Sequence, residues 1–355
     1  MTDRAIEAGG TGGSREGHRS GRRGLRGWGG VAGMAAACAL TIAATLLPLS
    51  WGAAGAPAPD SRTGGPPPVT LTAAEKCTEP ERSLRPSPED GPTIRAIRKR
   101  GYLIVGVDQN SYRWGYRDPI SGDIKGFDID LARTIAEDLL GSRKAVVFRA
   151  VSTNQRVSAL DSERVDIVVR TMTINCKRIK QVAFSTAYFR TGQQILAPEE
   201  SDITGWNSSL RGKRLCTAEG STATDALAEE TQGAVHRDRN DGNPADEDLL
   251  TVPNQLDCLV RIQEGLADAV LTDSALAAGQ AAQDPAMELK GVPFKFQYYG
   301  VATKLGKEDL VRRINKVLEE YRSDGSWIKA YRHWLAKDLP GITRPPDPKY
   351  HERER

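Results

Sequence analysis

The segment of this chain best suited to ligand chemistry runs from Asp166 to Ser185, DIVVRTMTINCKRIKQVAFS. Its apolar start indicates a buried strand, and hydroxyl and amide side chains (Thr171, Thr173, Asn175) follow where that strand ends. Arg170 and Arg178 lie in the same segment, and a guanidinium can make two parallel hydrogen bonds to a carboxylate. No histidine or cysteine is placed there as a base or nucleophile. We therefore expect a site that binds a small acid.

The elements that must position this segment alternate along the chain. We expect a parallel α/β arrangement, whose ligands bind at the carboxyl ends of strands. Residues 231–248 are polar and acidic, which indicates a surface insertion. The expected strands are 102–107, 145–150, 165–169, 214–217, 251–252 and 269–271, and the expected helices are 93–100, 129–139, 154–160, a helix ending near 228, 256–263 and 275–282.

Length and charge limit the classes of protein to consider. The 355 residues are enough for about two domains of ordinary size. The net charge is +3, but residues 1–56 hold six Arg or Lys against three Asp or Glu, so the rest of the chain is neutral. A folded part without excess basic charge argues against a nucleic-acid surface.

The first 56 residues have the pattern of an export signal. An arginine-rich stretch precedes an apolar run of about 18 residues (31–48), and small residues follow it. An uncleaved membrane anchor is the alternative, because the run is almost long enough to span a bilayer. Cys38 lies near the start of the run, whereas a lipidated cysteine should follow it. We expect an exported protein at the extracytoplasmic face of the cell membrane, either anchored or secreted.

Four further cysteines matter if the chain is exported, because disulfides persist outside the cytoplasm. Three pairings are open to Cys77, Cys176, Cys216 and Cys258. We favour Cys216–Cys258, which lie within one segment, and Cys77–Cys176, which would tie the amino-terminal extension to the first domain. Free thiols and a zinc site are the alternatives. Zinc is disfavoured because the sequence has no CxxC unit and only four histidines.

Several motifs, in their order and spacing, resemble the amino-acid-binding proteins of bacterial polar amino acid ABC importers. They cover about residues 92–340, and the motif MTINC is similar to that of actinobacterial glutamate-binding members. The motifs are GVDQ, GFDIDLARTIAEDL, RVSALDSERVDIVV, TMTINCKR, FSTAYF, LRGKRLCTAEGSTA, ADAVLTDSA, YYGVATK and WIKAYRHWL.

The resemblance implies a two-lobed type II periplasmic binding protein fold. Each lobe would be a sheet flanked by helices, and two crossing strands would join the lobes. Lobe 1 would comprise residues 92–191 plus 299–340, and lobe 2 residues 192–298. Residues 57–91 would be a disordered linker and residues 341–355 a disordered tail, since both are rich in Pro or charge.

The resemblance also assigns roles to residues of the cleft. Arg178 would bind the ligand's α-carboxylate, Thr171 and Thr173 would offer strand-end hydrogen bonds, and Asp273 would pair with the ligand's ammonium. Simple N-capping is the alternative for Ser221, which with Thr222 stands at a helix start that favours an anion. The further expected ligand contacts are an aromatic at Trp114 and cations at Arg156 and Arg170.

The cations decide the expected ligand. Family members that bind neutral amino acids have a small residue where Arg170 stands, so an acidic ligand, glutamate or aspartate, is expected, with glutamine or asparagine tolerated. A surface ion pair is the alternative for Arg156, with Asp161 as partner, and for Arg113. Asn175 and the longer first loop (108–122) depart from the family's pattern, which leaves open whether Tyr112 or Trp114 covers the ligand.

The expected activity is capture of the amino acid by a monomer and its delivery to ABC permease subunits, without cofactor, metal or catalytic residue. A module that reports amino acids to a membrane signalling partner is one alternative. A cyclohexadienyl dehydratase is the other. It is disfavoured because His236, His333 and His351 fall in the insertion, the last helix and the tail, so none is placed as a general base.

Overall fold

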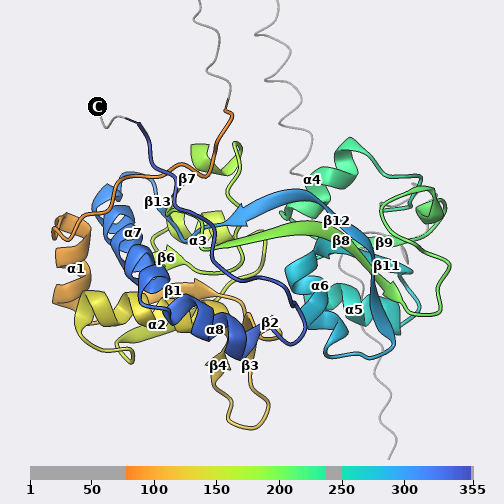
Figure 1. The fold of residues 1–355 in the computed structure, drawn as a ribbon, viewed down its shortest axis with the longest axis horizontal. Helices are drawn as coiled ribbons and strands as arrows, with labels where there is room; N and C mark the ends of the chain where they lie inside the picture. Colours follow the sequence, from red (N-terminus) through yellow and green to blue (C-terminus); the bar gives the residue numbers. More distant parts are fainter. Residues whose placement is uncertain (1–76, 237–249, 353–355) are drawn as a thin grey trace, which may run out of the picture. The chain divides into compact units, whose positions relative to one another are not determined.

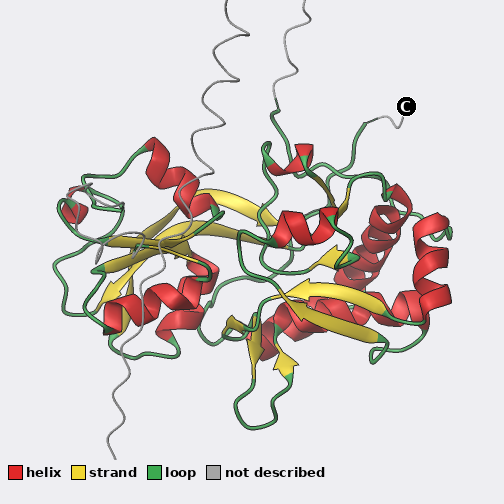
Figure 2. Cartoon of the chain, turned by 180° about the vertical axis from the view of Figure 1, so that it is seen from behind, coloured by secondary structure: helices red, strands yellow, loops and turns green. Residues whose placement is uncertain are grey.

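The computed structural model describes residues 77–236 and 250–352, which include two five-stranded sheets with helices packed against them (Figures 1 and 2). We call the first sheet, of order β5-β1-β6-β13-β7, and its helices lobe 1, and the second, of order β10-β9-β11-β8-β12, and its helices lobe 2. The predicted leader, with Cys38, and most of the predicted insertion lie outside the described residues.

Lobe 1 contains most of the helical segments. Its strands are β1 (Leu103–Val107), β5 (Val146–Ala150), β6 (Ile167–Val168), β7 (Val182–Phe184) and β13 (Ala302–Lys304). Its helices are α1 (Pro92–Arg100), α2 (Phe127–Leu140), α3 (Arg156–Asp161), α7 (Glu308–Ser323) and α8 (Ser326–Trp334), with the 3-10 turn η1 (Arg178–Lys180). A small sheet of β2 (Asn110–Ser111), β3 (Gly115–Arg117) and β4 (Ile124–Lys125) occupies the predicted first loop.

Lobe 2 is built on longer strands. These are β8 (Phe189–Pro198), β9 (Leu215–Ala218), β10 (Thr251–Val252), β11 (Ala269–Asp273) and β12 (Met287–Tyr299). Its helices are α4 (Thr222–Glu229), α5 (Gln255–Gln263) and α6 (Ser274–Ala281), with the 3-10 turn η2 (Ser208–Leu210).

The sheets are mixed, whereas the alternation of elements predicted parallel strands. β1 is parallel to β5 and β6, and β9 is parallel to β10 and β11, as expected for strand–helix–strand units. β13 is antiparallel to β6 and β7, and β8 is antiparallel to β11 and β12. Antiparallel strands are present because the chain passes twice between the lobes. Strands from distant parts of the sequence therefore complete each sheet.

The two passages between the lobes are β8 and β12, which pair side by side from Phe189–Tyr299 to Pro198–Met287 (Figure 1). At the lobe 1 end, Tyr299 also bridges to Thr173, so the crossing pair continues directly into the turn that follows β6. The predicted site segment is therefore bonded to the strands that connect the lobes.

Glycines fix the start and the end of helix α2. Gly126 precedes the helix at φ 133°, and a Cβ on it would lie 2.4 Å from the carbonyl oxygen of Trp114. Gly141 ends the helix in the left-handed region at φ 73°, where its N–H bonds to the carbonyl of Glu137. The chain therefore turns away from α2 at a residue suited to this geometry.

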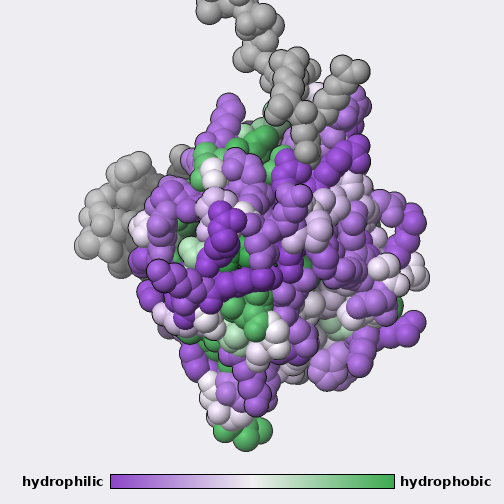
Figure 3. Space-filling view, turned by 90° about the vertical axis from the view of Figure 1, so that its left-hand side faces the viewer, coloured by the Kyte–Doolittle hydropathy of each residue, from purple (hydrophilic) through white to green (hydrophobic). Residues whose placement is uncertain are grey.

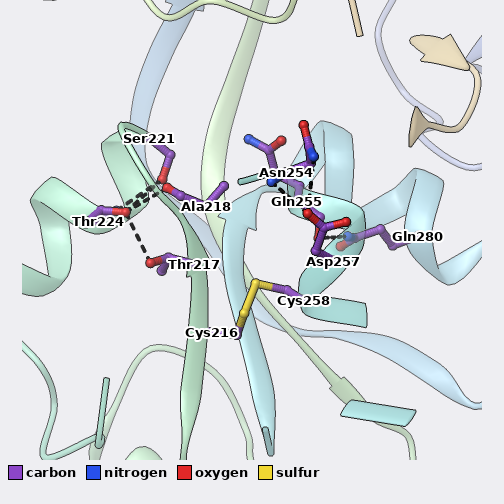
Figure 4. Close-up of a disulfide and its surroundings, with 10 residues drawn as sticks. All are labelled: Cys216, Thr217, Ala218, Ser221, Thr224, Asn254, Gln255, Asp257, Cys258 and Gln280. Atoms are coloured by element: carbon purple, nitrogen blue, oxygen red, sulfur yellow. Dashed lines mark hydrogen bonds between the residues drawn. A yellow bond between two sulfur atoms is a disulfide. The ribbon is translucent and has the colours of Figure 1, made fainter. Parts of the chain in front are cut away.

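The structure contains both favoured disulfides. Cys77 is joined to Cys176, and Cys216 to Cys258, with sulfur–sulfur distances of 2.03 and 2.01 Å. The second bond ties β9 to α5, and Ser221 and Asn254, the residues that precede α4 and α5, are drawn above it (Figure 4). The pairing prediction is confirmed, and the zinc alternative is excluded for these cysteines.

The predicted disorder of the tail and of the linker end is wrong for residues 341–352 and 77–91. Ser83 donates its N–H to the carbonyl of Lys349 at 3.0 Å, and the N–H of His351 donates to the carbonyl of Ser83 at 3.0 Å, so the two segments are joined by a parallel β-bridge between Ser83 and Tyr350. The ammonium of Lys349 contacts Glu81 at 2.7 Å. Sequence composition missed this order because each segment is stabilised by the other and by the Cys77–Cys176 bond.

The surface shown in Figure 3 is mainly hydrophilic, with apolar residues scattered between polar ones. Within residues 77–236 and 250–352, no helix combines the length and the apolar character needed to cross a bilayer.

We predict that replacing Cys216 and Cys258 together by alanine lowers the free energy of unfolding by about 2–4 kcal/mol, because the cross-link restricts the unfolded chain. The two residues are separated by 42 positions, and both are fully buried. Denaturant unfolding of the purified protein measures the change. An unchanged free energy of unfolding would show that the bond has no stabilising role.

Candidate functional site

The turn after β6 has an unusual backbone that a buried carboxylate stabilises. Thr171 has φ 40°, which a β-branched residue rarely adopts. Its N–H donates to Asp128 at 2.9 Å, and the hydroxyl of Tyr188 donates to the same carboxylate at 2.9 Å. Burial raises the pKa of Asp128 to about 7, against these two hydrogen bonds. Asp128 thus stabilises the turn and accepts from the backbone N–H of Thr171, one of the strand-end groups that were expected to bind the ligand.

Arg178 lies where the sequence predicted it, at the end of this turn and 7% exposed. One terminal nitrogen donates to the carbonyl of Thr173 at 2.7 Å, and the other to the carbonyl of Gly220 in lobe 2 at 2.9 Å. Burial lowers the pKa of Arg178, and the charge of Asp273 opposes that effect. No ion pair joins Arg178 to a carboxylate among the described residues, so its charge is balanced only by carbonyl dipoles and by a nearby acid.

Arg156 lies beside Arg178 and shares its partner in lobe 2. It donates to the carbonyls of Thr153 at 2.8 Å and Gly220 at 3.3 Å, and it is 4% exposed. Burial lowers its pKa, and the charges of Arg178 and Arg170 add to the effect. The surface pair with Asp161, the alternative raised from the sequence, is not formed. Two buried guanidinium groups therefore converge on one carbonyl oxygen.

Arg170 is fully buried and has a charged partner that the sequence did not reveal. Its guanidinium pairs with Asp108 at 3.0 Å and donates to the side chains of Thr153 at 3.0 Å and Asn254 at 3.2 Å. The Nε of Arg170 has no hydrogen-bond partner among the described residues. Asn254 belongs to lobe 2, so Arg170 also bridges the lobes. Its charge is cancelled by Asp108, which weakens the premise for an acidic ligand.

Asp273 ends β11 facing this group of arginines, and it is 7% exposed. Its carboxylate accepts hydrogen bonds from the hydroxyl of Tyr299 and the amide of Gln297, both on the crossing strand β12. Burial raises the pKa of Asp273 to about 6, while these bonds and the charges of Arg178 and Arg156 act in the opposite direction. A buried carboxylate beside unpaired guanidinium groups gives the site one anionic and one cationic end.

Ser221 and Thr222 form the start of α4. The hydroxyl of Ser221 accepts from the N–H of Thr224 at 3.2 Å, so Ser221 is an N-cap, the structural alternative raised from the sequence. Thr222 lines a hollow of about 640 Å³ together with Thr173, Gln193 and Gln297. The helix start therefore borders the same hollow as Gln297, which donates to Asp273.

Trp114 belongs to the core, not to an open face of the cleft. It is 1% exposed and packs edge-on against Phe127, Phe189 and Tyr299. Its indole N–H donates to the carbonyl of Ala275 in lobe 2 at 3.0 Å. Trp114, expected to contact the ligand and one of the two aromatics left open as its cover, is already enclosed by other aromatic rings. Sequence cannot distinguish a loop aromatic that packs inward from one that faces a ligand.

Arg113, for which an ion pair was the alternative to a ligand contact, pairs with Asp338 at 2.7 Å. Asp108 and Asp128 were not assigned a role from the sequence. Each is an acid directly beside an apolar element, which was the available signal for a buried carboxylate. Among the residues the structure describes, no cluster of His, Cys, Asp and Glu side chains is arranged to hold a metal ion.

Known proteins are similar to this chain in sequence and in fold. Residues 103–337 match the family of bacterial extracellular solute-binding proteins, family 3. The ABC transporter glutamine-binding protein GlnH of Bacillus subtilis (strain 168) is 32% identical over 69% of this chain and 85% of its own length. The glutamate-binding protein GluB of Corynebacterium efficiens is 26% identical over 70% and 84%.

Solved structures agree with the sequence relatives. An ancestral arginine-binding protein bound to glutamine superposes with a TM-score of 0.59 at 32% identity, covering 66% of this chain and 98% of that one. Holo ArgBP from T. maritima gives a TM-score of 0.57 at 27% identity, covering 68% and 99%. The fold is that of type II periplasmic binding proteins, and the relatives are binding proteins rather than enzymes. The chain therefore belongs to the bacterial extracellular solute-binding proteins, family 3.

Proposed function

We propose that this protein captures an α-amino acid with a polar side chain between its lobes, at the extracytoplasmic face, and delivers it to the permease subunits of an ABC importer. Delivery rests on the family and on the Bacillus subtilis relative, which is the glutamine-binding protein of an ABC transporter. The export pattern of residues 1–56 is consistent with that location.

One observation carries the binding proposal. Arg178 and Arg156 are buried without an ion pair among the described residues, and the carboxylate of Asp273 faces them from lobe 2. A zwitterionic head group is complementary to this pair of charges, with its carboxylate on the guanidinium groups and its ammonium on Asp273. Because Arg156 and Arg178 both donate to Gly220, they form a single anion site, suited to one carboxylate.

The proposed side-chain site is the Arg170–Asp108 pair with Thr153 and Asn254 around it. A paired cation and anion offer both donors and acceptors, and the Nε of Arg170 remains as a free donor. A side-chain amide can use both, whereas a carboxylate would be repelled by Asp108. We therefore place glutamine ahead of glutamate and aspartate, a change from the preference predicted from the sequence.

Replacing Arg178 by alanine should weaken binding of every amino acid ligand about a hundredfold, because two charge-assisted hydrogen bonds to the α-carboxylate are lost. Calorimetric titration of the purified protein with a panel of L-amino acids measures this. Arg113→Met is the matched control, since it breaks an ion pair outside the cleft and should leave affinities unchanged. Full affinity in Arg178→Ala would contradict the assignment of the head-group site.

Replacing Asp108 by asparagine should shift the preference toward glutamate by about tenfold, because Arg170 would then present an unpaired charge. The ratio of glutamate to glutamine dissociation constants, measured for the variant and the unmodified protein, reports this shift. The asparagine oxygen can still accept the loop hydrogen bonds that Asp108 receives from Gln109 at 2.8 Å and Asn110 at 3.0 Å. An unchanged ratio would mean that Arg170 does not face the ligand's side chain.

A further inference from the structure

Gln193 is a buried amide whose oxygen is not satisfied. The residue lies in the crossing strand β8 and is 1% exposed. Its Oε1 is buried and has no hydrogen-bond partner among the described residues. A buried polar atom without a partner has lost its hydrogen bonds to water and gained none in return, so such an atom is rare in a folded protein and calls for an explanation.

The register of the sheet places Gln193 next to Asp273. The two residues are directly opposite one another in the antiparallel pair of β8 and β11. Side chains of opposite residues point to the same face of a sheet, with Cβ atoms about 5 Å apart. Gln193 therefore shares the face of the sheet on which Asp273 meets the arginine groups of the cleft.

A second observation concerns the hollow that Gln193 lines. Its volume is about 640 Å³, and Thr173, Thr222 and Gln297 also line it. Thr173 belongs to the turn that holds Arg178, and Gln297 donates to Asp273. The hollow is thus lined by Gln193, by a hydrogen-bond partner of Arg178 and by a hydrogen-bond partner of Asp273.

We propose that Gln193 is a further ligand-binding residue, whose side-chain oxygen accepts a hydrogen bond from the α-ammonium beside Asp273. An ammonium has three donors and one carboxylate does not use all of them, so a neutral acceptor next to Asp273 completes its coordination. The inference rests on the proposed function, since it requires that an amino acid occupy the cleft. Gln193 would then contact the head group of the ligand and not its side chain.

The test replaces Gln193 by methionine, which keeps the shape of the side chain and removes its polar atoms. Affinity for glutamine should fall about tenfold, and affinity for any second amino acid that binds should fall by the same factor. The melting temperature without added amino acid should not fall, because an unsatisfied buried oxygen is removed. This opposite effect on binding and stability distinguishes a ligand contact from a structural role.

Gln194→Met is the matched control. Gln194 is the next residue on the same strand, 6% exposed, and its amide donates to the carbonyl of Gly291 at 2.6 Å. Its replacement should lower the melting temperature and leave the dissociation constant unchanged. Gln193→Asn, which retracts the oxygen by one methylene, should weaken binding in the same way as Gln193→Met.

Several results would overturn the inference. These are an unchanged dissociation constant in Gln193→Met, a weakened affinity accompanied by a lowered melting temperature, or a loss confined to one ligand side chain. Failure of both Gln193 variants to fold would also overturn it, because the amide would then be required by the fold. If the unmodified protein binds no amino acid, the proposed function itself fails, which is a different outcome from loss in the variants alone.

Discussion

The structure depends on burying three guanidinium groups, those of Arg156, Arg170 and Arg178, beyond the carboxyl ends of β5 and β6 in the first sheet. Moving a charged group out of water costs several kcal/mol unless hydrogen bonds and opposite charges replace the water. For Arg170 the ion pair with Asp108 offsets this cost. For Arg156 and Arg178, hydrogen bonds to carbonyl oxygens offset part of it. Each of the three also takes a partner from lobe 2, through Gly220 or Asn254. The same three arginines therefore determine the electrostatics of the site and form contacts between the lobes.

The crossing strands extend this coupling. β12 supplies Tyr299 and Gln297 to Asp273, and Tyr299 also bridges to the turn that holds Arg178. A ligand that satisfies Arg178 in lobe 1 and Asp273 in lobe 2 would favour the arrangement in which both are close. In the proposed account, binding energy and lobe closure come from the same two residues.

The sequence was sufficient for features whose signal is local. Arg178, Asp273 and the helices have recognisable patterns in the chain, and the four cysteines found the partners favoured for them. The sequence did not reveal ion pairs between buried side chains that are distant along the chain. Asp108 and Arg170 are 62 positions apart in the sequence, so the cancellation of the charge on Arg170 became visible only in the structure.

Other failures have the same origin. The sequence gives no sign of whether Trp114 packs inward, because that depends on rings from three separate elements, α2, β8 and β12. Residues 341–352 have a disordered composition, yet they are held by an amino-terminal segment more than 250 positions away. Gln193 is one of several glutamines in the sequence, and only the register with Asp273 singles it out.

The central claim is that Arg178 and Asp273 bind the two ends of one amino acid. A crystal structure of the protein grown with excess glutamine tests it most directly. The account predicts the α-carboxylate on the guanidinium of Arg178, the ammonium on Asp273 and the side-chain amide at Arg170 and Asp108. A ligand bound elsewhere, or bound with its head group reversed so that the carboxylate avoids Arg178, would contradict the account.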